Sequence, residues 1–166
     1  MKKELFNDNW LFWNMGDSFA LVWNIPEDAK KVNLPHDAMI EETPYAESGN
    51  GGNTGFRDGH NYVYLKHFEA TEEDLSQIKI LKFEGSYMNT FVYVNGQLAG
   101  KHHNGYTVFY VSIHEFLKVG RNEIRVEVRN GAMNNSRWYS GSGLYRDVYL
   151  LSSSPFYIAE TGTRVT

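Results

Sequence analysis

The feature of this sequence that most restricts its fold is an alternation of apolar and charged residues with a period of two. It is clearest in the segment Glu123–Arg129, where Ile124, Val126 and Val128 alternate with charged residues. Because successive side chains of a strand point to opposite faces, this pattern predicts an antiparallel strand with one buried and one exposed face. Helical periodicity is scarce in the rest of the sequence, so we predict an all-β fold.

A hairpin and several further strands follow from the same reasoning. Asn95-Gly96 separates Phe91–Val94 from Gln97–Gly100, and Asn-Gly supplies the two positive φ angles of a type I′ turn. Short strands joined by turns rich in glycine and asparagine are typical of a β-sandwich or barrel. Further strands are expected at residues 19–23, 62–68, 78–83, 107–113, 144–151 and 156–159.

Two short helical turns are expected between the strands. Thr71 stands at the N-cap position before Glu72, and Asp74 occupies the carboxylate position of a capping box. The segment His114–Gly120 indicates a second turn, which ends at the glycine.

Composition excludes several classes of protein. The 166 residues fit one domain, and the absence of cysteine excludes disulfides, thiolate zinc sites and a cysteine nucleophile. A net charge of −4 argues against a nucleic-acid partner or an anionic membrane surface. No apolar run approaches the roughly 18 residues of a membrane span. Acidic residues interrupt the N-terminus, so we expect no signal peptide and a cytoplasmic, bacterial protein.

Two long polar segments, Glu47–His60 and Asn130–Ser136, break the strand pattern, and loops on a rigid sandwich commonly carry binding residues. The second segment leads directly into Arg137, Trp138 and Tyr139. Sugar binding requires a flat aromatic face for the apolar side of the ring and planar polar groups for its hydroxyls, and these residue types supply both. The alternative is that the two aromatic residues pack beneath the loop and the arginine pairs with an acid.

Arg57 and Asp58, in the first long segment, add a donor and an acceptor to this candidate substrate-binding set. No catalytic pair is evident, because the adjacent Glu41 and Glu42 would point to opposite faces of an extended chain and are expected to be a solvated acidic patch. The adjacent His102-His103 has no metal-ligand spacing either. We therefore predict no catalytic residue, no metal site and no cofactor within this chain.

Seven short motifs follow one another along residues 9–160. They are Asn9-Trp10, Val32–Asp37, Phe83–Gly85, Val92–Gly96, Gly105–Phe109, Asn122–Val128 and Asn135–Leu150. Together they resemble the N-terminal sugar-binding domain of glycoside hydrolase family 2, which comprises β-galactosidases, β-glucuronidases and β-mannosidases. Several motifs in a fixed order make this resemblance far more specific than any one motif, although Ala38 replaces the usual tryptophan of the second.

The resemblance implies a jelly-roll β-sandwich, similar to galactose-binding domains, over residues 1–160. Residues 161–166 would then begin a linker to an immunoglobulin-like domain, followed by a TIM barrel that carries both catalytic glutamates of a retaining mechanism. On this basis the chain alone is expected to be inactive. Its expected partners are a carbohydrate, the remaining domains of the parent enzyme and, for that parent, further copies in a homo-oligomer.

In the family, this domain helps to form the wall of the subsite for the non-reducing sugar, through loops that correspond here to Asp58, Arg137 and Trp138. Some members carry an aspartate where Arg137 stands, so that carboxylate's role is not transferred. The Arg-Trp pair favours a β-galactoside. Arg146 and Asp147 match the closing motif and are expected to form a structural ion pair. The alternatives are an autonomous carbohydrate-binding module and a purely structural or oligomerisation domain.

Overall fold

The computed structural model describes residues 1–15, 24–131, 138–158 and 162, and these form two packed antiparallel sheets. One sheet has the strand order β1 (Lys2–Leu5), β10 (Val148–Ser153), β5 (Ile78–Phe83), β8 (Phe109–Ser112). The other has the order β3 (Lys30–Val32), β2 (Trp10–Asn14), β4 (Asn61–Ala70), β9 (Gly120–Arg129), β6 (Thr90–Val94), β7 (Gln97–His102). The predicted jelly-roll β-sandwich is confirmed.

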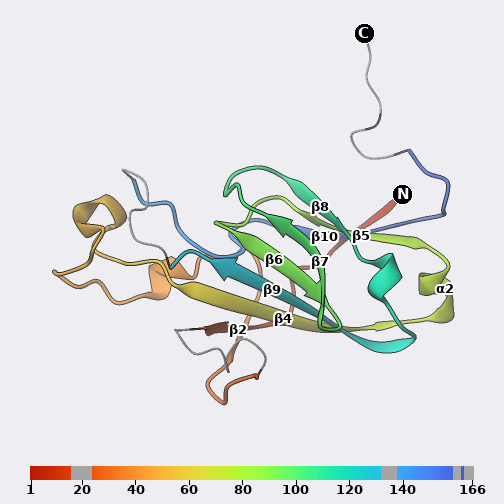
Figure 1. Cartoon of the computed structure of the whole chain (residues 1–166), viewed down its shortest axis with the longest axis horizontal. Helices are drawn as coiled ribbons and strands as arrows, with labels where there is room; N and C mark the ends of the chain where they lie inside the picture. Colours follow the sequence, from red (N-terminus) through yellow and green to blue (C-terminus); the bar gives the residue numbers. More distant parts are fainter. Residues whose placement is uncertain (16–23, 132–137, 159–161, 163–166) are drawn as a thin grey trace, which may run out of the picture.

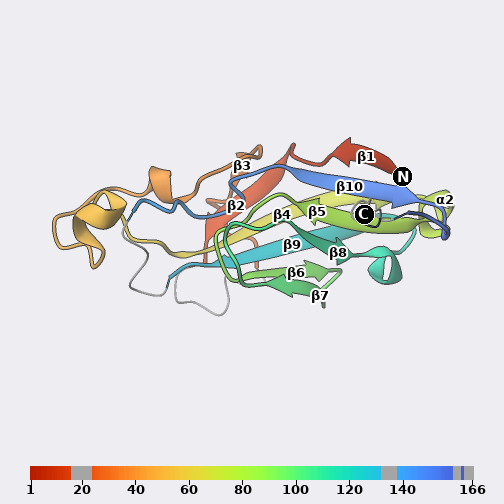
Figure 2. The same cartoon turned by 90° about the horizontal axis from the view of Figure 1, so that it is seen from above.

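Short helical segments lie at the two ends of the sandwich. The 3₁₀ turns η1 (Met39–Glu41) and η2 (Gly51–Thr54) lie at one end, and α2 (Glu72–Leu75) and η3 (His114–Phe116) lie at the other (Figures 1 and 2). Among the described residues, no helix has the length and apolar character needed to cross a bilayer.

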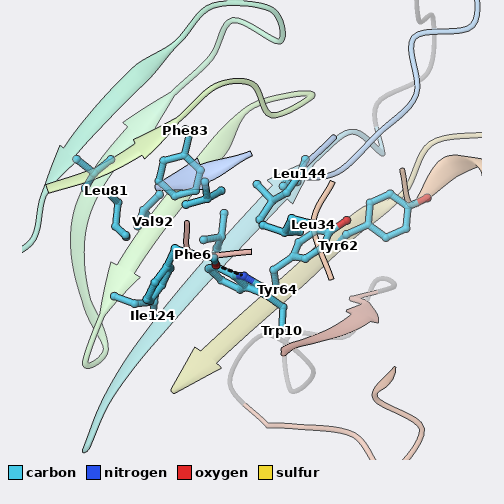
Figure 3. Close-up of a cluster of buried hydrophobic side chains, with 14 of the residues drawn as sticks. Phe6, Trp10, Leu34, Tyr62, Tyr64, Leu81, Phe83, Val92, Ile124 and Leu144 are labelled. Carbon is cyan, nitrogen blue, oxygen red and sulfur yellow. Dashed lines mark hydrogen bonds between the residues drawn. The ribbon is translucent and has the colours of Figure 1, made fainter. Parts of the chain in front are cut away.

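The space between the sheets is filled by aromatic and branched aliphatic side chains (Figure 3). Phe83 and Phe109 stack with centroids 4.7 Å apart, and Trp10 is fully buried with its indole nitrogen donating to the Phe6 carbonyl oxygen at 2.9 Å. Each such side chain contributes about 2–3 kcal/mol by leaving water. The core therefore accounts for much of the aromatic content of the chain.

Strand β9 differs from its prediction at its centre. Its apolar residues face the core as expected, but Arg125 and Glu127 on the opposite face are also buried. The strand is central in the six-stranded sheet, and the register places Leu65 and Val63 of β4 beside these two charged residues. Burial of charge requires partners, and Arg129 supplies one to Glu127 at 2.7 Å. The expectation of a solvent-exposed charged face is thus wrong at these two positions.

Two local turn predictions are confirmed, and the third is wrong at its end: η3 stops at Phe116 with Leu117 as its C-cap, and Gly120 begins β9 instead of ending the turn. Asn95 and Gly96 have φ angles of 49° and 81°, as a type I′ turn between β6 and β7 requires. At the start of α2, the Thr71 hydroxyl accepts from the Asp74 amide at 3.2 Å, and the Asp74 carboxylate accepts from the Thr71 amide at 2.9 Å. Both features depend on neighbours in sequence, which is why the sequence alone reveals them.

The strand expected at 144–151 begins only at Val148, because Leu144 accepts a hydrogen bond from the amide of His36 instead of pairing within a sheet. Residues 156–158 form no strand, so that prediction is wrong over the part described. The strand expected at 19–23 lies outside the described residues. The strands at 62–68, 78–83 and 107–113 correspond to β4, β5 and β8.

Strands β1, β2 and β3 were not predicted. The first is exposed along its whole length, and the second buries residues on both faces, so neither shows an alternating pattern.

Candidate functional site

Two neighbouring segments, residues 33–42 and 45–60, meet the distant segment 138–144 at the end of the sandwich that carries η1 and η2 (Figure 1). Backbone amides of His36 and Ala38 donate to the carbonyl oxygens of Leu144 and Ser142, each at 2.8 Å. The second and last motifs of the sequence therefore lie side by side, although about a hundred residues separate them. We call these three segments the loop end.

Asp37 connects two of these segments through its carboxylate. One carboxylate oxygen accepts from the amides of Met39 and Ser142, both at 3.0 Å, and the other accepts from the Tyr139 hydroxyl at 2.7 Å. Burial and this bond to Asp37 raise the pKa of Tyr139, so the phenol stays protonated and donates. Sequence reasoning missed Asp37, and its place in the second motif was the only signal.

Trp138 lies on the surface, with 59% of its area exposed, so the packed alternative for this side chain does not describe the structure. Its indole nitrogen donates to the Tyr106 hydroxyl at 3.3 Å, and the Tyr106 ring packs edge-on against Tyr87 at 5.4 Å. Tyr106 is also half-exposed and was not among the predicted site residues. Trp138 and Tyr106 together present two exposed rings beside the Tyr139–Asp37 contact.

Asp58 is bonded within its own loop. Its carboxylate accepts from the hydroxyls of Tyr45 and Ser48 and from the backbone amides of Gly49 and Asn50. These hydrogen bonds, led by that from Ser48, lower the pKa of Asp58 to about 2. The carboxylate thus orders residues 45–50.

Arg57 joins the loop of Asp58 to η1, because its Nε donates to the Glu42 carbonyl oxygen at 3.0 Å and Nη1 to the Gly55 carbonyl oxygen at 3.4 Å. It lies close enough to Tyr139 for its charge to oppose part of the rise in the pKa of that phenol. The structure therefore brings Arg57, Tyr139 and Trp138 to the same end of the molecule. Arg137, the remaining predicted site residue, lies outside the described residues.

Glu41 ends the 3₁₀ turn η1 and Glu42 follows it, and each contacts partners of its own in the chain, so the expected solvated acidic patch is wrong. Glu41 accepts from Lys30 at 3.0 Å and contacts His36 at 3.1 Å, whereas Glu42 accepts from the Tyr62 hydroxyl at 3.1 Å. Burial opposes the shift, but the hydrogen bonds from Lys30 and His36 lower the pKa of Glu41. Both glutamates line a pocket of about 220 Å³.

The described stretches of chain hold no group of three or more histidine, aspartate and glutamate side chains placed to bind a metal ion. The adjacent histidines diverge: His102 stacks on Phe109 at 4.3 Å, and His103 contacts the Asn89 side chain at 3.1 Å. Phe109 and Asn89, the residues that these two histidines contact, lie outside the loop end.

The expected ion pair between Arg146 and Asp147 is wrong. Arg146 donates to the carbonyl oxygens of Glu84 and Tyr106, and Asp147 accepts from the side chains of Asn7 and Tyr149. Adjacent residues of an extended chain point in opposite directions, so each finds a different partner.

Exposed aromatic rings beside hydrogen-bonding side chains suit a carbohydrate, whose ring has an apolar face and a polar edge. The model of the sugar-binding domain of family 2 glycosyl hydrolases matches residues 53–154. The β-galactosidase BoGH2A of Bacteroides ovatus is 35% identical over 164 residues, which is 97% of this chain and 19% of that protein. A β-glucuronidase of Bacteroides fragilis is 28% identical over 153 residues, or 89% and 20% of the two chains.

Among solved structures, a β-glycosidase from Bacteroides vulgatus superposes with a TM-score of 0.84 at 33% identity, over 93% of this chain and 20% of that one. A family 2 glycosyl hydrolase from Bacteroides cellulosilyticus gives the same TM-score at 32% identity, over 93% and 21%. The chain therefore belongs to glycosyl hydrolase family 2, as a sugar-binding domain. It spans about a fifth of the length of these relatives.

Proposed function

We propose that this domain contacts the non-reducing sugar of a β-galactoside and forms part of the wall of a retaining glycosidase subsite whose catalytic carboxylates lie outside this chain. The observation that carries the proposal is the exposed Trp138, which is anchored on one side by Tyr106 and followed directly by Tyr139, which is bonded to Asp37. An exposed ring held in place at both sides is a surface prepared for a ligand rather than a packing residue.

Each predicted site residue has a distinct part in the proposal. Trp138 offers its ring face to the apolar side of the pyranose. Tyr139 follows it in sequence as a polar neighbour, and Arg57 lies close enough to Tyr139 to affect the pKa of its phenol. Arg137 precedes Trp138 in sequence and is assigned to the same contact. Asp58 acts indirectly, by ordering the loop that carries Arg57.

A non-catalytic role agrees with how the acidic side chains of the loop end are used. A glycosidase needs two carboxyl groups about 5–10 Å apart across the scissile bond. In the described part of the loop end, Asp37, Glu41, Glu42 and Asp58 each accept hydrogen bonds from the chain itself. These four carboxylates are used in hydrogen bonds that stabilise the fold, which agrees with catalytic carboxylates that lie outside this chain.

The charge of the loop end favours a neutral galactoside over a glucuronide. Five described carboxylates lie in the loop end (Asp37, Glu41, Glu42, Glu47 and Asp58), against one described permanent cation, Arg57. Lys30, just outside these segments, is paired with Glu41 at 3.0 Å. An anionic sugar would meet repulsion here, whereas a neutral one would not. This supports the β-galactoside assignment over the glucuronide that the other relative's name suggests.

The proposal is tested with the 166-residue chain by calorimetric titration of methyl β-galactoside and by assay of nitrophenyl β-galactoside hydrolysis. We expect weak binding that Trp138→Ala abolishes, no hydrolysis, and no effect of Phe156→Ala. Phe156 is a matched control because it is 94% exposed and follows Ser153, which pairs with Ile78 near α2. Turnover by the purified chain, or binding unaffected by Trp138→Ala, would contradict the proposal.

The same titration separates this proposal from an autonomous carbohydrate-binding module. A Kd tighter than about 1 mM, equivalent to roughly −4 kcal/mol, would favour the autonomous module. Weaker binding would favour a partial site that other parts of an enzyme complete.

A further inference from the structure

The backbone contacts between the second and last motifs hold only the inner part of the closing loop. They connect His36 to Leu144 and Ala38 to Ser142, and Gly143 is additionally bridged to Tyr87 by two hydrogen bonds of 3.0 Å. These bonds fix residues 142–144 against the sandwich and leave the orientation of the outer residues to other contacts.

The outer part of the loop is held by the Asp37 side chain. On this loop, the Asp37 carboxylate accepts hydrogen bonds from the Ser142 amide and from the Tyr139 hydroxyl, three residues earlier in the chain. Gly141 lies between these two contacts with φ of 69°, and a Cβ on that residue would lie 3.0 Å from the Asp37 carboxylate. Because glycine has no side chain and tolerates a positive φ, the backbone at this position can pass close to the Asp37 carboxylate.

Tyr139 is the direct neighbour of Trp138. The two side chains are anchored in different places, Tyr139 on Asp37 and Trp138 on Tyr106. The Trp138 anchor is a longer bond of 3.3 Å between two exposed groups, whereas the Tyr139 anchor is a 2.7 Å bond to a carboxylate. Hydrogen bonds to charged acceptors are stronger than neutral ones, so the stronger constraint on this part of the loop comes from Asp37.

We propose that Asp37 is a positioning residue for sugar binding: it holds residues 138–142 in the conformation that presents Trp138 and does not itself contact the sugar. The inference rests on the proposed function, in which Trp138 faces the ligand. The Asp37 carboxylate accepts three hydrogen bonds from the described residues, two from backbone amides and one from a phenol, and two of these join it to Tyr139 and Ser142 of the loop. Its effect on affinity is therefore exerted through the loop.

The most selective test is Tyr139→Phe, which removes the hydroxyl that bonds to Asp37 but keeps the ring and the two amide contacts of the carboxylate. Tyr149→Phe is the matched control, because it removes a tyrosine–aspartate bond of 3.0 Å to Asp147, which belongs to neither loop-end contact described above. Two readouts are taken on each variant: NMR relaxation of the Trp138 indole N–H without ligand, and affinity for methyl β-galactoside.

We expect Tyr139→Phe to increase the mobility of the Trp138 indole and to weaken galactoside binding about threefold to tenfold, the loss expected for one hydrogen bond of ordinary net strength, since this bond is exposed to solvent. The melting temperature should stay close to that of wild type, and Tyr149→Phe should change neither readout. Asp37→Asn keeps an oxygen acceptor and should give a smaller loss than Asp37→Ala. If Asp37→Ala does not fold, the phenylalanine variant still decides the question.

Unchanged indole mobility in Tyr139→Phe would overturn the inference whatever the affinity, because weakened binding with an unmoved indole would mean that the Tyr139 hydroxyl contacts the sugar directly. A mobile indole with unchanged affinity, in a chain where Trp138→Ala abolishes binding, would overturn the positioning role and leave the proposed function intact. Binding that Trp138→Ala leaves unchanged would overturn the proposed function and, with it, the role of Asp37.

Discussion

The two ends of this sandwich use aspartate in different ways. At the end that carries α2, Asp74 completes a capping box with Thr71, three residues away, and pairs with Lys79 at 2.6 Å. At the loop end, Asp37 joins residues 102 and 105 positions away in sequence. The local arrangement caps the start of a helix, whereas the long-range arrangement fixes one loop against another and leaves Trp138 exposed beside it. The candidate site therefore differs from the α2 end in that a carboxylate distant in sequence holds a partly exposed aromatic residue, Tyr139.

The largest effect that separates the two ends is expected from Gly143→Ala. Gly143 has φ of 102°, and a Cβ there would lie 2.2 Å from the Tyr64 hydroxyl oxygen. We expect the free energy of unfolding to fall by about 3 kcal/mol, because the new methyl group meets a buried side chain in a strained backbone conformation. Urea denaturation measures this loss.

Gly96→Ala is the control for that change. Gly96 also has a positive φ, of 81°, but a Cβ there would meet nothing within 4 Å. Its cost should be about 1 kcal/mol, from the backbone conformation alone. Equal losses of unfolding free energy in the two variants would show that the close approach of Gly143 to Tyr64 adds nothing to the cost of the substitution.

Acid should destabilise both ends together. Hydrogen bonds lower the pKa of Asp58 to about 2 and that of Asp74 to about 2, against an ordinary value of 3.8. A carboxyl group with a lowered folded-state pKa stabilises the fold fully above its unfolded pKa, and that contribution is lost as the pH falls. Stability should therefore decrease between about pH 4 and pH 2, as followed by thermal melts.

The double variant Asp58→Asn, Asp74→Asn should flatten this part of the pH profile and be less stable than wild type at pH 7. A wild-type profile that is flat between pH 4 and pH 2 would contradict the assignment of these hydrogen bonds.

A smaller effect on stability is expected from Asp58→Asn alone, about 1 kcal/mol, since the amide keeps one acceptor oxygen for the loop donors. Hydrogen exchange should accelerate at the backbone amides of Gly49 and Asn50 and not at α2. Asp74→Asn should do the reverse. Exchange that changes at both ends in either variant would mean that the two ends are coupled rather than independent.

The smallest effect is expected from Tyr106→Phe, which removes the acceptor of the Trp138 indole and keeps the ring that packs on Tyr87. We expect a change in stability within about 0.5 kcal/mol, because both groups of the lost bond are exposed. Galactoside affinity should fall by less than it does in Tyr139→Phe. A larger loss in Tyr106→Phe would place the main anchor of Trp138 on Tyr106 instead of Asp37.

The sequence predicts those features that depend on neighbouring residues. The Asn95-Gly96 turn, the Thr71 cap and the extent of β5 follow from local chemistry and the pattern of apolar residues. The burial of Arg125 could not be predicted in this way, because the alternation is that of a half-exposed strand and only the position of β9 within the sheet covers its second face.

The residues proposed for the site can be chosen from the sequence, but the hydrogen bonds that they make cannot. Arg57, Trp138 and Tyr139 were identified from residue type and loop context, and the structure brings them to one end. That Asp58 serves its own loop, and that Asp37 holds the closing loop, depends on contacts across the fold that no local pattern encodes.

The central claim, that the loop end contacts sugar, is tested most directly by mapping amide and indole chemical shifts of the chain during titration with methyl β-galactoside. The account predicts that the shifts concentrate at Trp138, Tyr139 and Arg57, with none at Asp74 or Lys79 at the opposite end. Shifts confined to the α2 end, or no shifts at the loop end at saturating sugar, would contradict it.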